Sequence, residues 1–344
     1  MSERDLRPLI IPIFISHTGC PHRCIFCDQE KITSQPVRPI DSDYVKEVLN
    51  RAIHSKKFDT RRNPEVAFYG GTFTGLPIDR MKRLLRSVGP YIRNRVVRSI
   101  RVSTRPDFLD EERLQIMKAC QVETVELGVQ SMDDHVLSMA RRGHDAGDVT
   151  RAVEILKRNG FKVGIQLMPG LPGDSVGKFR TTIEKVISLG PDMVRLYPAV
   201  VIEGTGLARM YKEGNYRPLT LEEAIDLCVD GTVRLETNGI PVIRIGLMSS
   251  PSLVETGRVV SGPWHPAFGF LVRSAIHHKA IEPDLPVPGT SAQIRIFAPE
   301  REIPLIRGYK NRGIKVIEAK TGAEVVGIAV DGTVSNGRVR IEKK

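Results

Sequence analysis

The chain has 344 residues, long enough for one barrel-sized α/β unit with an appendage or for two domains. Hydrophobic residues make up 41% and charged residues 26%, which is an ordinary globular composition and excludes a disordered or fibrous chain. The 51 Lys and Arg against 40 Asp and Glu give a net charge of +11, which favours a polyanionic partner such as RNA but also fits a scattered basic surface.

The first predicted strand, LIIPIFIS at 9–16, is an almost continuous apolar run that leads directly into a cysteine-rich loop. The run contains Pro12 and is too short to span a membrane, and no signal-peptide cleavage site follows it. We therefore expect a cytoplasmic protein that does not contact a membrane. The five cysteines are odd in number and three are clustered, unlike a secreted disulfide framework, so free thiols are expected.

The cysteine-rich loop, HTGCPHRCIFCDQ, holds Cys20, Cys24 and Cys27 in the spacing C-x3-C-x2-C. Thiolates favour iron–sulfur clusters or zinc, and the short loop lets three sulfurs converge on one centre. A [4Fe-4S] cluster normally takes four cysteines, so three would leave one iron open to another ligand. Zinc completed by His17 or His22 is the alternative, although no second ligand pair follows in the sequence, and a disulfide is a third possibility.

Five more strand-like runs follow, each ahead of an amphipathic stretch with helical spacing. The strands are predicted at 65–69, 99–103, 122–127, 162–167 and 193–197, and the helices at 78–88, 111–119, 149–158 and 176–189 and from about Asp41 after the first strand. Six strand–helix units in a row predict a parallel sheet, because each parallel crossover needs a dozen or more residues and a helix supplies them. In an open α/β sheet or a barrel, functional residues gather where the strands end.

The last third of the chain begins with a helix whose capping box is Thr220 with Glu223. We then expect a helix at 267–280, a linker at 283–289 and a small α+β region in which AQIRIFA, IKVIEA, EVVGIAV and RVRIE have the pattern of strands. The predicted division is a barrel domain at 1–240, a connecting segment with a helix at 241–290 and an α+β region at 291–344.

Three further residues are candidates for chemistry without a motif. Cys120 and Cys228 lie among apolar neighbours, so we expect core thiols rather than ligands. His265 stands beside the only tryptophan of the chain in GPWHPAFG, and both a packing role and a substrate contact are open for it.

A cysteine motif after the first of six strand–helix units makes the chain resemble the radical S-adenosylmethionine (SAM) enzymes, whose fold is a partial (βα)6 TIM-type barrel. Phe26 fits the aromatic residue commonly found between the second and third cysteines of that family. More narrowly, the chain resembles the radical SAM module of the catalytic subunit of Elongator. The motifs that carry this likeness are GGTF at 70–73, TRPD at 104–107, LGVQS at 127–131, RRGH at 141–144, MPGLPG at 168–173 and VIEGTGL at 201–207.

The resemblance implies that the three cysteines bind a [4Fe-4S] cluster and that the open iron binds SAM. SAM would be cleaved to a 5'-deoxyadenosyl radical with an electron donor such as a ferredoxin or a flavodoxin. The residues implied to contact SAM are Gly70, Gly71 and Thr72 at the methionyl amino group, Arg142 at the carboxylate, and Gln130 and Gln166 elsewhere, the latter at the ribose. Ser103 stands where relatives often have an acidic residue, so the resemblance does not support a ribose contact there.

The resemblance also implies a substrate. The catalytic subunit of Elongator modifies C5 of the wobble uridine of tRNA and pairs its radical domain with an acetyltransferase domain, for which this chain has no room. We expect a radical SAM enzyme that does not use acetyl-CoA and that acts on tRNA or another RNA. Two alternatives stay open: a radical SAM enzyme acting on a small molecule such as a tetrapyrrole, and a non-catalytic iron–sulfur protein that binds RNA or senses redox state.

Overall fold

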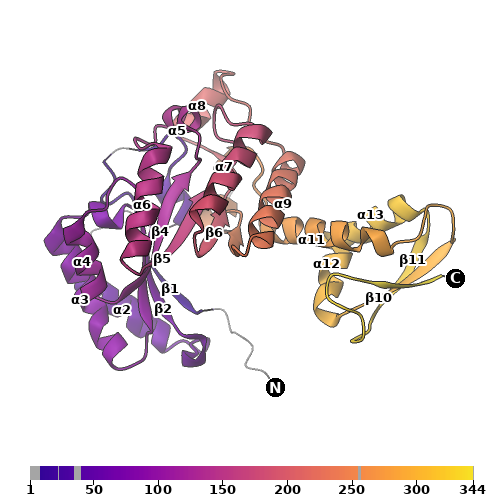
Figure 1. The fold of residues 1–344 in the computed structure, drawn as a ribbon, viewed down its shortest axis with the longest axis horizontal. Coiled ribbons are helices and arrows are strands. Elements are labelled where there is room, and N and C mark those ends of the chain that lie inside the picture. The colour runs from indigo at the N-terminus through magenta and orange to yellow at the C-terminus, as the bar shows by residue number, and fades with distance from the viewer. Residues whose placement is uncertain (1–7, 22, 35–39, 255–256, 344) are drawn as a thin grey trace.

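The computed structural model describes residues 8–21, 23–34, 40–254 and 257–343. Its larger part is a curled sheet of seven parallel strands with helices around the outside (Figure 1). In sheet order the strands are β1 (Ile10–Phe14), β2 (Glu65–Tyr69), β3 (Ser99–Thr104), β4 (Val122–Gln130), β5 (Lys162–Leu167), β6 (Met193–Leu196) and β8 (Val242–Ile245). The predicted partial barrel is confirmed. The seventh strand was not predicted, because the sequence after Pro241 shows no clear strand–helix pattern.

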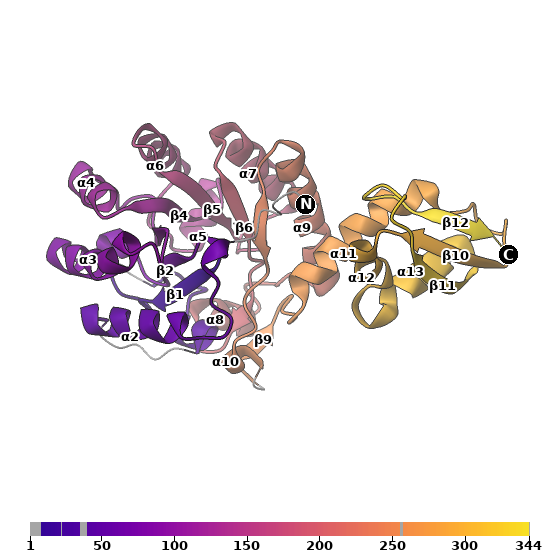
Figure 2. The ribbon, with the colours of Figure 1, turned by 90° about the horizontal axis from the view of Figure 1, so that it is seen from below.

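Helices follow the strands and cover the outer face of the curled sheet (Figure 2). The longer ones are α2 (Ser42–Ile53), α3 (Ile78–Arg93), α4 (Glu111–Ala119), α6 (Ala146–Arg158), α7 (Val176–Leu189) and α9 (Leu221–Thr237). Shorter elements lie near the strand ends: α1 (Gln29–Thr33), α5 (Asp134–Met139), α8 (Gly206–Lys212), α10 (Pro251–Val254) and the ribbon of β7 (Val201–Ile202) with β9 (Val259–Ser261). The predicted capping box of α9 is confirmed, since both of its hydrogen bonds are present. Within the described ranges no helix is long and apolar enough to cross a membrane.

Side chains alternate along each strand, and the two faces of the sheet have opposite character. On β1, Ile11 and Ile13 are buried in the core between sheet and helices, whereas Pro12 and Phe14 line the interior of the curl. In closed TIM barrels the interior is filled by branched apolar residues. Here the inward positions of the central strands carry charged and polar groups instead, so the interior is a polar cavity and the apolar core lies outside it.

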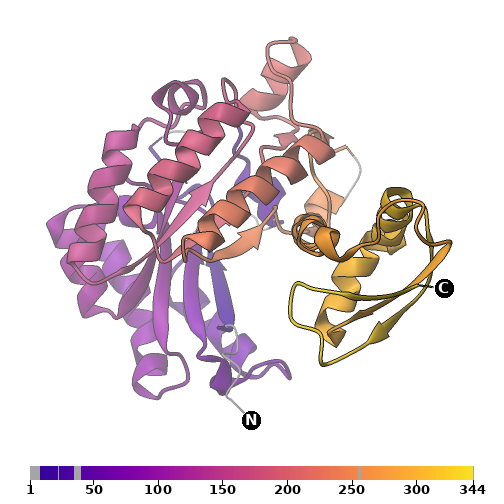
Figure 3. The ribbon, with the colours of Figure 1, turned by 45° about the vertical axis from the view of Figure 1, so that its right-hand side comes forward.

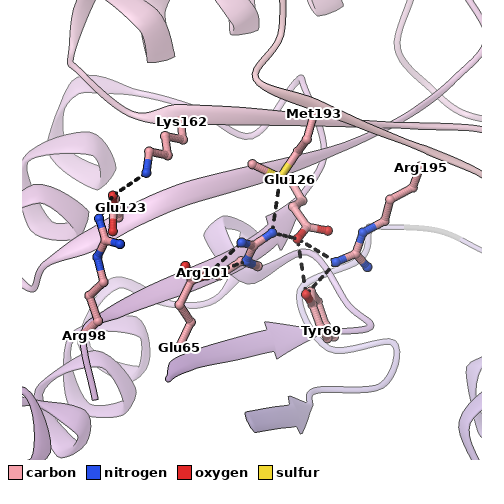
Figure 4. A network of polar contacts seen from close by, with 9 residues as sticks. All are labelled: Glu65, Tyr69, Arg98, Arg101, Glu123, Glu126, Lys162, Met193 and Arg195. Carbon is pink, nitrogen blue, oxygen red and sulfur yellow. Dashed lines mark hydrogen bonds and ion pairs between the residues drawn. The ribbon is translucent and has the colours of Figure 1, made fainter. Parts of the chain in front are cut away.

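Four charged residues from neighbouring strands form a network inside the curl (Figure 4). Arg101 on β3 contacts Glu65 on β2 and Glu126 on β4, each at 2.7 Å. Glu126 also contacts Arg195 on β6 at 2.8 Å. The side chains of Arg101, Glu65 and Glu126 are each only 7% exposed, so every charge in the network depends on its partners.

The C-terminal part is a small α+β domain that α11 (Phe268–Ile281) joins to the barrel (Figures 1 and 3). Its sheet has the order β11 (Glu324–Val330), β10 (Gln293–Ala298) and β12 (Arg340–Lys343), and its helices are α12 (Ile303–Arg307) and α13 (Arg312–Thr321). The α+β prediction is confirmed. The prediction of a strand at IKVIEA was wrong: the run lies in α13, where Gly313, Ile317 and Thr321 are buried at the four-residue spacing of a helix face.

We predict that Arg101→Met lowers the free energy of unfolding by about 3 to 5 kcal/mol, because it leaves Glu65 and part of Glu126 buried without a counter-charge. Arg98→Met is the matched control, since Arg98 pairs with Glu123 at the amino-terminal ends of β3 and β4 and is 49% exposed, and we expect less than about 1 kcal/mol there. Urea unfolding followed by circular dichroism measures both. Equal effects of the two substitutions would contradict a buried, interdependent network.

Candidate active site

A cavity of about 470 Å³ lies inside the curl and opens at the carboxyl ends of the strands, within the size range of small-molecule sites. All nine residues implied by the family resemblance line it: Cys20, Cys24, Cys27, Gly70, Gly71, Thr72, Gln130, Arg142 and Gln166. They come from segments far apart in the sequence. The topology explains their meeting, because parallel strands present their carboxyl ends, and the loops that follow, at one edge of the sheet.

The cysteine loop packs directly on the glycine turn that follows β2. The Cys20 thiol lies 3.3 Å from the Thr72 hydroxyl, and the backbone N–H of Thr72 donates to the carbonyl of Thr18 at 3.0 Å. A Cβ at Gly71 would lie 2.0 Å from that same carbonyl oxygen, a distance that backbone cannot tolerate. Gly71 is therefore required for the close approach of the two loops, beside any role that its backbone has toward a ligand.

Gln29 at the start of α1 connects both loops, although no sequence motif singles it out. The ring nitrogen Nε2 of His17 accepts from the Gln29 backbone N–H at 3.0 Å, and the Gln29 amide donates to the Gly70 carbonyl at 2.5 Å. Burial, followed by the charge of Arg23, lowers the pKa of His17. This hydrogen bond occupies Nε2 and gives His17 a role in holding the loop, and a zinc ion at His17 would have to bind through Nδ1. His22 lies outside the described residues.

The other side of the cysteine loop is apolar. Ile25 and Phe26 are buried in a separate hydrophobic cluster that includes Met168 and Leu207, with Cys24 and Cys27 at its edge. Burial, followed by the charges of Cys24 and Cys20, raises the pKa of the Cys27 thiol to about 12. All three cysteines are half-buried and line the same cavity, and desolvation of the Cys27 thiol is the main cause of its raised pKa. Such surroundings suit a ligand that replaces the thiol protons, as a metal centre does.

The donor set fits a cluster better than a single ion. In the part of the chain that the structure describes, no three His, Cys, Asp or Glu side chains are grouped so that they could hold a metal ion. Ligands of one tetrahedral zinc stand about 3.8 Å apart, as follows from Zn–S bonds of about 2.3 Å. Thiolates of an iron–sulfur cluster bind different irons and stand farther apart. Three cysteines that line one cavity without such a grouping fit the second case better than the first.

The remaining polar residues implied to contact SAM contact the loop and each other. The Arg142 guanidinium donates to the Cys24 sulfur at 2.9 Å and also to the Gly128 carbonyl. The Gln166 amide donates to the Gln130 side-chain oxygen at 2.9 Å. Gln130 has a φ of 74°, and the register of β4 against β5 shifts at this point. A left-handed conformation at a residue other than glycine is costly and is typical of ligand sites.

The TRPD and RRGH motifs meet beside Arg142. Arg105 forms a two-pronged ion pair with Asp107, with distances of 2.9 and 2.7 Å. His144 is buried next to this pair, and its Nδ1 lies 4.0 Å from Asp107. Burial, followed by the charges of Arg142 and Arg105, lowers the pKa of His144 to about 4. His144 is therefore a neutral packing residue under the turn that carries Arg142.

The cavity is also lined by Tyr69, Glu126, Arg195 and Tyr197, none of which was predicted as a site residue. A signal for them exists in the sequence. Each of the runs SIRVS, VETVEL and MVRLY carries charge within an otherwise apolar strand, and a charge in such a strand is costly unless it is paired in a functional interior.

The three candidate residues that belong to no motif have packing roles. Cys228 is buried in the main core and Cys120 packs against it, as predicted. His265 packs edge-on against Tyr309 of the C-terminal domain at 4.8 Å between ring centroids, and its Nδ1 accepts from the Ala267 backbone N–H. These contacts favour the packing role for His265.

Comparison with known families gives two matches that together span most of the chain. The model of the Radical SAM superfamily matches residues 14–186, and that of the Radical_SAM C-terminal domain matches residues 191–278. An uncharacterized protein of Methanocaldococcus jannaschii is 32% identical over 83% of this chain and 87% of its own length.

Similar proteins with names fall into two groups. A tRNA uridine(34) acetyltransferase of Methanocaldococcus infernus is 30% identical over 63% of this chain, which spans about half (48%) of that relative. The heme chaperone HemW of Bacillus subtilis is 26% identical over 73% of this chain and 66% of its own length. Among solved structures, Elp3 of Methanocaldococcus infernus has a TM-score of 0.58 at 24% identity, covering 79% of this chain and 63% of its own, which supports the fold.

We predict that His144 makes the protein less stable in mild acid. Its pKa of about 4 lies below the value of about 6.5 in an unfolded chain, so between these pH values the unfolded chain binds more protons and stability rises with pH. Lowering the pH from 7 to 5 should therefore reduce the free energy of unfolding of the unaltered chain by about 2 kcal/mol more than that of the His144→Asn variant.

The measurement is urea unfolding of both proteins at pH 7 and pH 5. His54→Asn is the control, since His54 is exposed at the end of α2, and it should keep the pH dependence of the unaltered chain. An identical pH dependence in the His144 variant would contradict the buried neutral imidazole.

Proposed function

The chain belongs to the radical SAM superfamily, and from that premise we propose that it binds a [4Fe-4S] cluster and cleaves SAM reductively to modify a uridine of tRNA. Cys20, Cys24 and Cys27 would hold the cluster. One observation carries this proposal: the three thiols line a single cavity together with every residue implied to contact SAM. When bound, the cluster supplies the electron that cleaves the SAM sulfonium to a 5'-deoxyadenosyl radical, and a ferredoxin or flavodoxin would renew that electron.

The residues of the chain would position SAM and keep water away. The carbonyls of the turn from Gly70 to Thr72 would accept from the methionyl amino group, and Arg142, which already reaches Cys24, would pair with the carboxylate. The joined amides of Gln130 and Gln166 would meet the polar edge of the ribose. Phe26 and its apolar neighbours would shield the cluster from solvent, which reactive radicals require.

Two findings support tRNA as the substrate. The net charge of +11 suits a polyanion, and a relative at 30% identity is a tRNA uridine(34) acetyltransferase. Because this chain spans about half of that relative, acetyl transfer is not part of the proposal.

A tetrapyrrole-like small molecule is the second candidate. The likeness to HemW, over 73% of this chain, is the observation that favours it.

We predict that anaerobic reconstitution with iron and sulfide gives a four-iron cluster, and that SAM with dithionite then yields 5'-deoxyadenosine. Replacing Cys20, Cys24 and Cys27 by Ser should abolish both iron binding and the product. Replacing Cys120 and Cys228 by Ser is the matched control and should keep both, because these thiols lie in or against the core. Bound zinc in place of iron, or a cluster without SAM cleavage, would contradict the proposal.

We also predict salt-sensitive binding of tRNA. Each phosphate that Lys or Arg neutralises releases counterions, so four such contacts would weaken binding about 100-fold between 50 and 200 mM salt. Fluorescence anisotropy with labelled tRNA measures this dependence in the absence of reductant. Negligible affinity at 50 mM salt would remove tRNA from the proposal and leave the radical chemistry in place.

A further inference from the structure

The cavity extends well below the residues implied to contact SAM. Glu126 lies four residues before Gln130 on β4, which is about 13 Å deeper along the strand at about 3.3 Å per residue. Arg195 on β6 is the register partner of Gln166, and its guanidinium reaches Glu126 and the hydroxyl of Tyr69, which ends β2 just before Gly70 (Figure 4). All three line the cavity, beside and below the residues implied to contact SAM, so a ligand that fills the rest of the cavity would meet them.

Glu126 and Arg195 present an acceptor beside a donor. In the described part of the chain, the hydrogen bonds that Glu126 accepts, from Arg101, Arg195 and Tyr69, all end on Oε1, which leaves Oε2 for a ligand. The Arg195 nitrogen Nη2 donates to Glu126 at 2.8 Å and to the Tyr69 hydroxyl at 2.7 Å, whereas Nη1 has only a long contact of 3.4 Å with Tyr197. Nη1 therefore keeps a donor for a ligand.

Next to this pair stands an apolar, aromatic wall. Phe14 and Tyr69 have ring centroids 6.5 Å apart, and the Arg195 guanidinium lies 5.0 Å from the Tyr69 ring centroid. Pro12 and Ile10 extend the wall along the edge strand β1. Enzymes that act on a base commonly hold it outside its helix by stacking it on aromatic or apolar side chains and by bonding its polar edge.

Where Glu126 and Arg195 meet, the local charge favours a neutral ligand edge. The network of Arg101 and Arg195 with Glu65 and Glu126 is balanced, and each arginine is already paired. A carboxylate placed directly against Glu126 would be repelled, whereas the other arginines of the cavity wall, among them Arg142 and Arg244, would attract one. A neutral ligand edge with a donor next to an acceptor would instead form hydrogen bonds with both the Glu126 carboxylate and the Arg195 guanidinium.

We propose that Glu126 and Arg195 read the imide edge of a uracil base that stacks against Phe14 and Tyr69. The inference rests on the proposed function and names the residues that select the base. The N3–H of uracil would donate to Glu126 Oε2, and a flanking carbonyl would accept from Arg195. Cytosine has an unprotonated N3, which would face the carboxylate, so the same pair rejects it.

The test compares two anticodon stem–loop RNAs that differ only in uridine or cytidine at the wobble position. Their affinities for the anaerobically reconstituted protein are measured by fluorescence anisotropy without reductant, so no turnover is needed. We expect binding of the uridine RNA to be tighter by about 5- to 150-fold, the range of one well-formed pair of hydrogen bonds to a base.

Two variants assign this preference to the pair. Glu126→Gln should reduce it to within about 3-fold, because an amide can either accept from uracil or donate to cytosine. Arg195→Lys should lower it in part, since the charge stays but the planar fork is lost. Glu123→Gln is the matched control at the start of the same strand, where Glu123 pairs with Arg98 and Lys162 outside the cavity lining, and it should keep the full preference (Figure 4). Circular dichroism melts confirm that each variant is folded.

The outcomes separate the two levels of the account. Equal affinity for both RNAs would overturn the proposal that Glu126 and Arg195 recognise uracil, and so would an unchanged preference in both the Glu126 and the Arg195 variants. Neither result would contradict tRNA binding or SAM cleavage. Failure to bind either RNA at low salt overturns the tRNA function together with this inference. A preference that both variants lower and the Glu123 variant keeps supports it.

Discussion

The alternation of side chains along seven parallel strands is the constraint on which the rest of this structure depends. Outward positions such as Ile13 and Val102 bury themselves under the helices and supply the core. Inward positions therefore do not have to contribute to the apolar core. They are occupied by the charged residues Arg101, Glu126 and Arg195, which form ion pairs. Because a buried charge is tolerated only beside its partner, the network both requires the curl of the sheet and defines a cavity with fixed polar walls.

The common direction of the strands then decides what stands over that cavity. The cysteine loop after β1 and the glycine turn after β2 are neighbours because β1 and β2 pair in parallel. Their contact is close enough that Gly71 cannot carry a side chain, and Gln29 fastens the loop to the turn through Gly70. The thiols are thus placed by backbone packing, with an apolar cluster on one side and the polar cavity on the other.

Motifs at strand ends could be predicted because their residue types and order are local properties of the sequence. Gly70, Gln130, Arg142 and the three cysteines were named before their convergence was visible, and the structure brings them to one cavity. Tertiary contacts explain what was missed. Glu126 looks like any charge in a strand until Arg101 and Arg195 are seen to reach it, and the apolar run in α13 reads equally well as a strand until its buried positions show a spacing of four.

The central claim is that three cysteines at the mouth of this cavity leave one iron of a cluster open to SAM. Electron paramagnetic resonance of the reduced, reconstituted protein tests it most directly, with spectra recorded before and after addition of SAM. The account predicts a [4Fe-4S]⁺ signal whose g values shift when SAM is added, because SAM becomes a ligand of the open iron. A signal that SAM leaves unchanged, or a protein that takes up zinc and gives no signal, would contradict it.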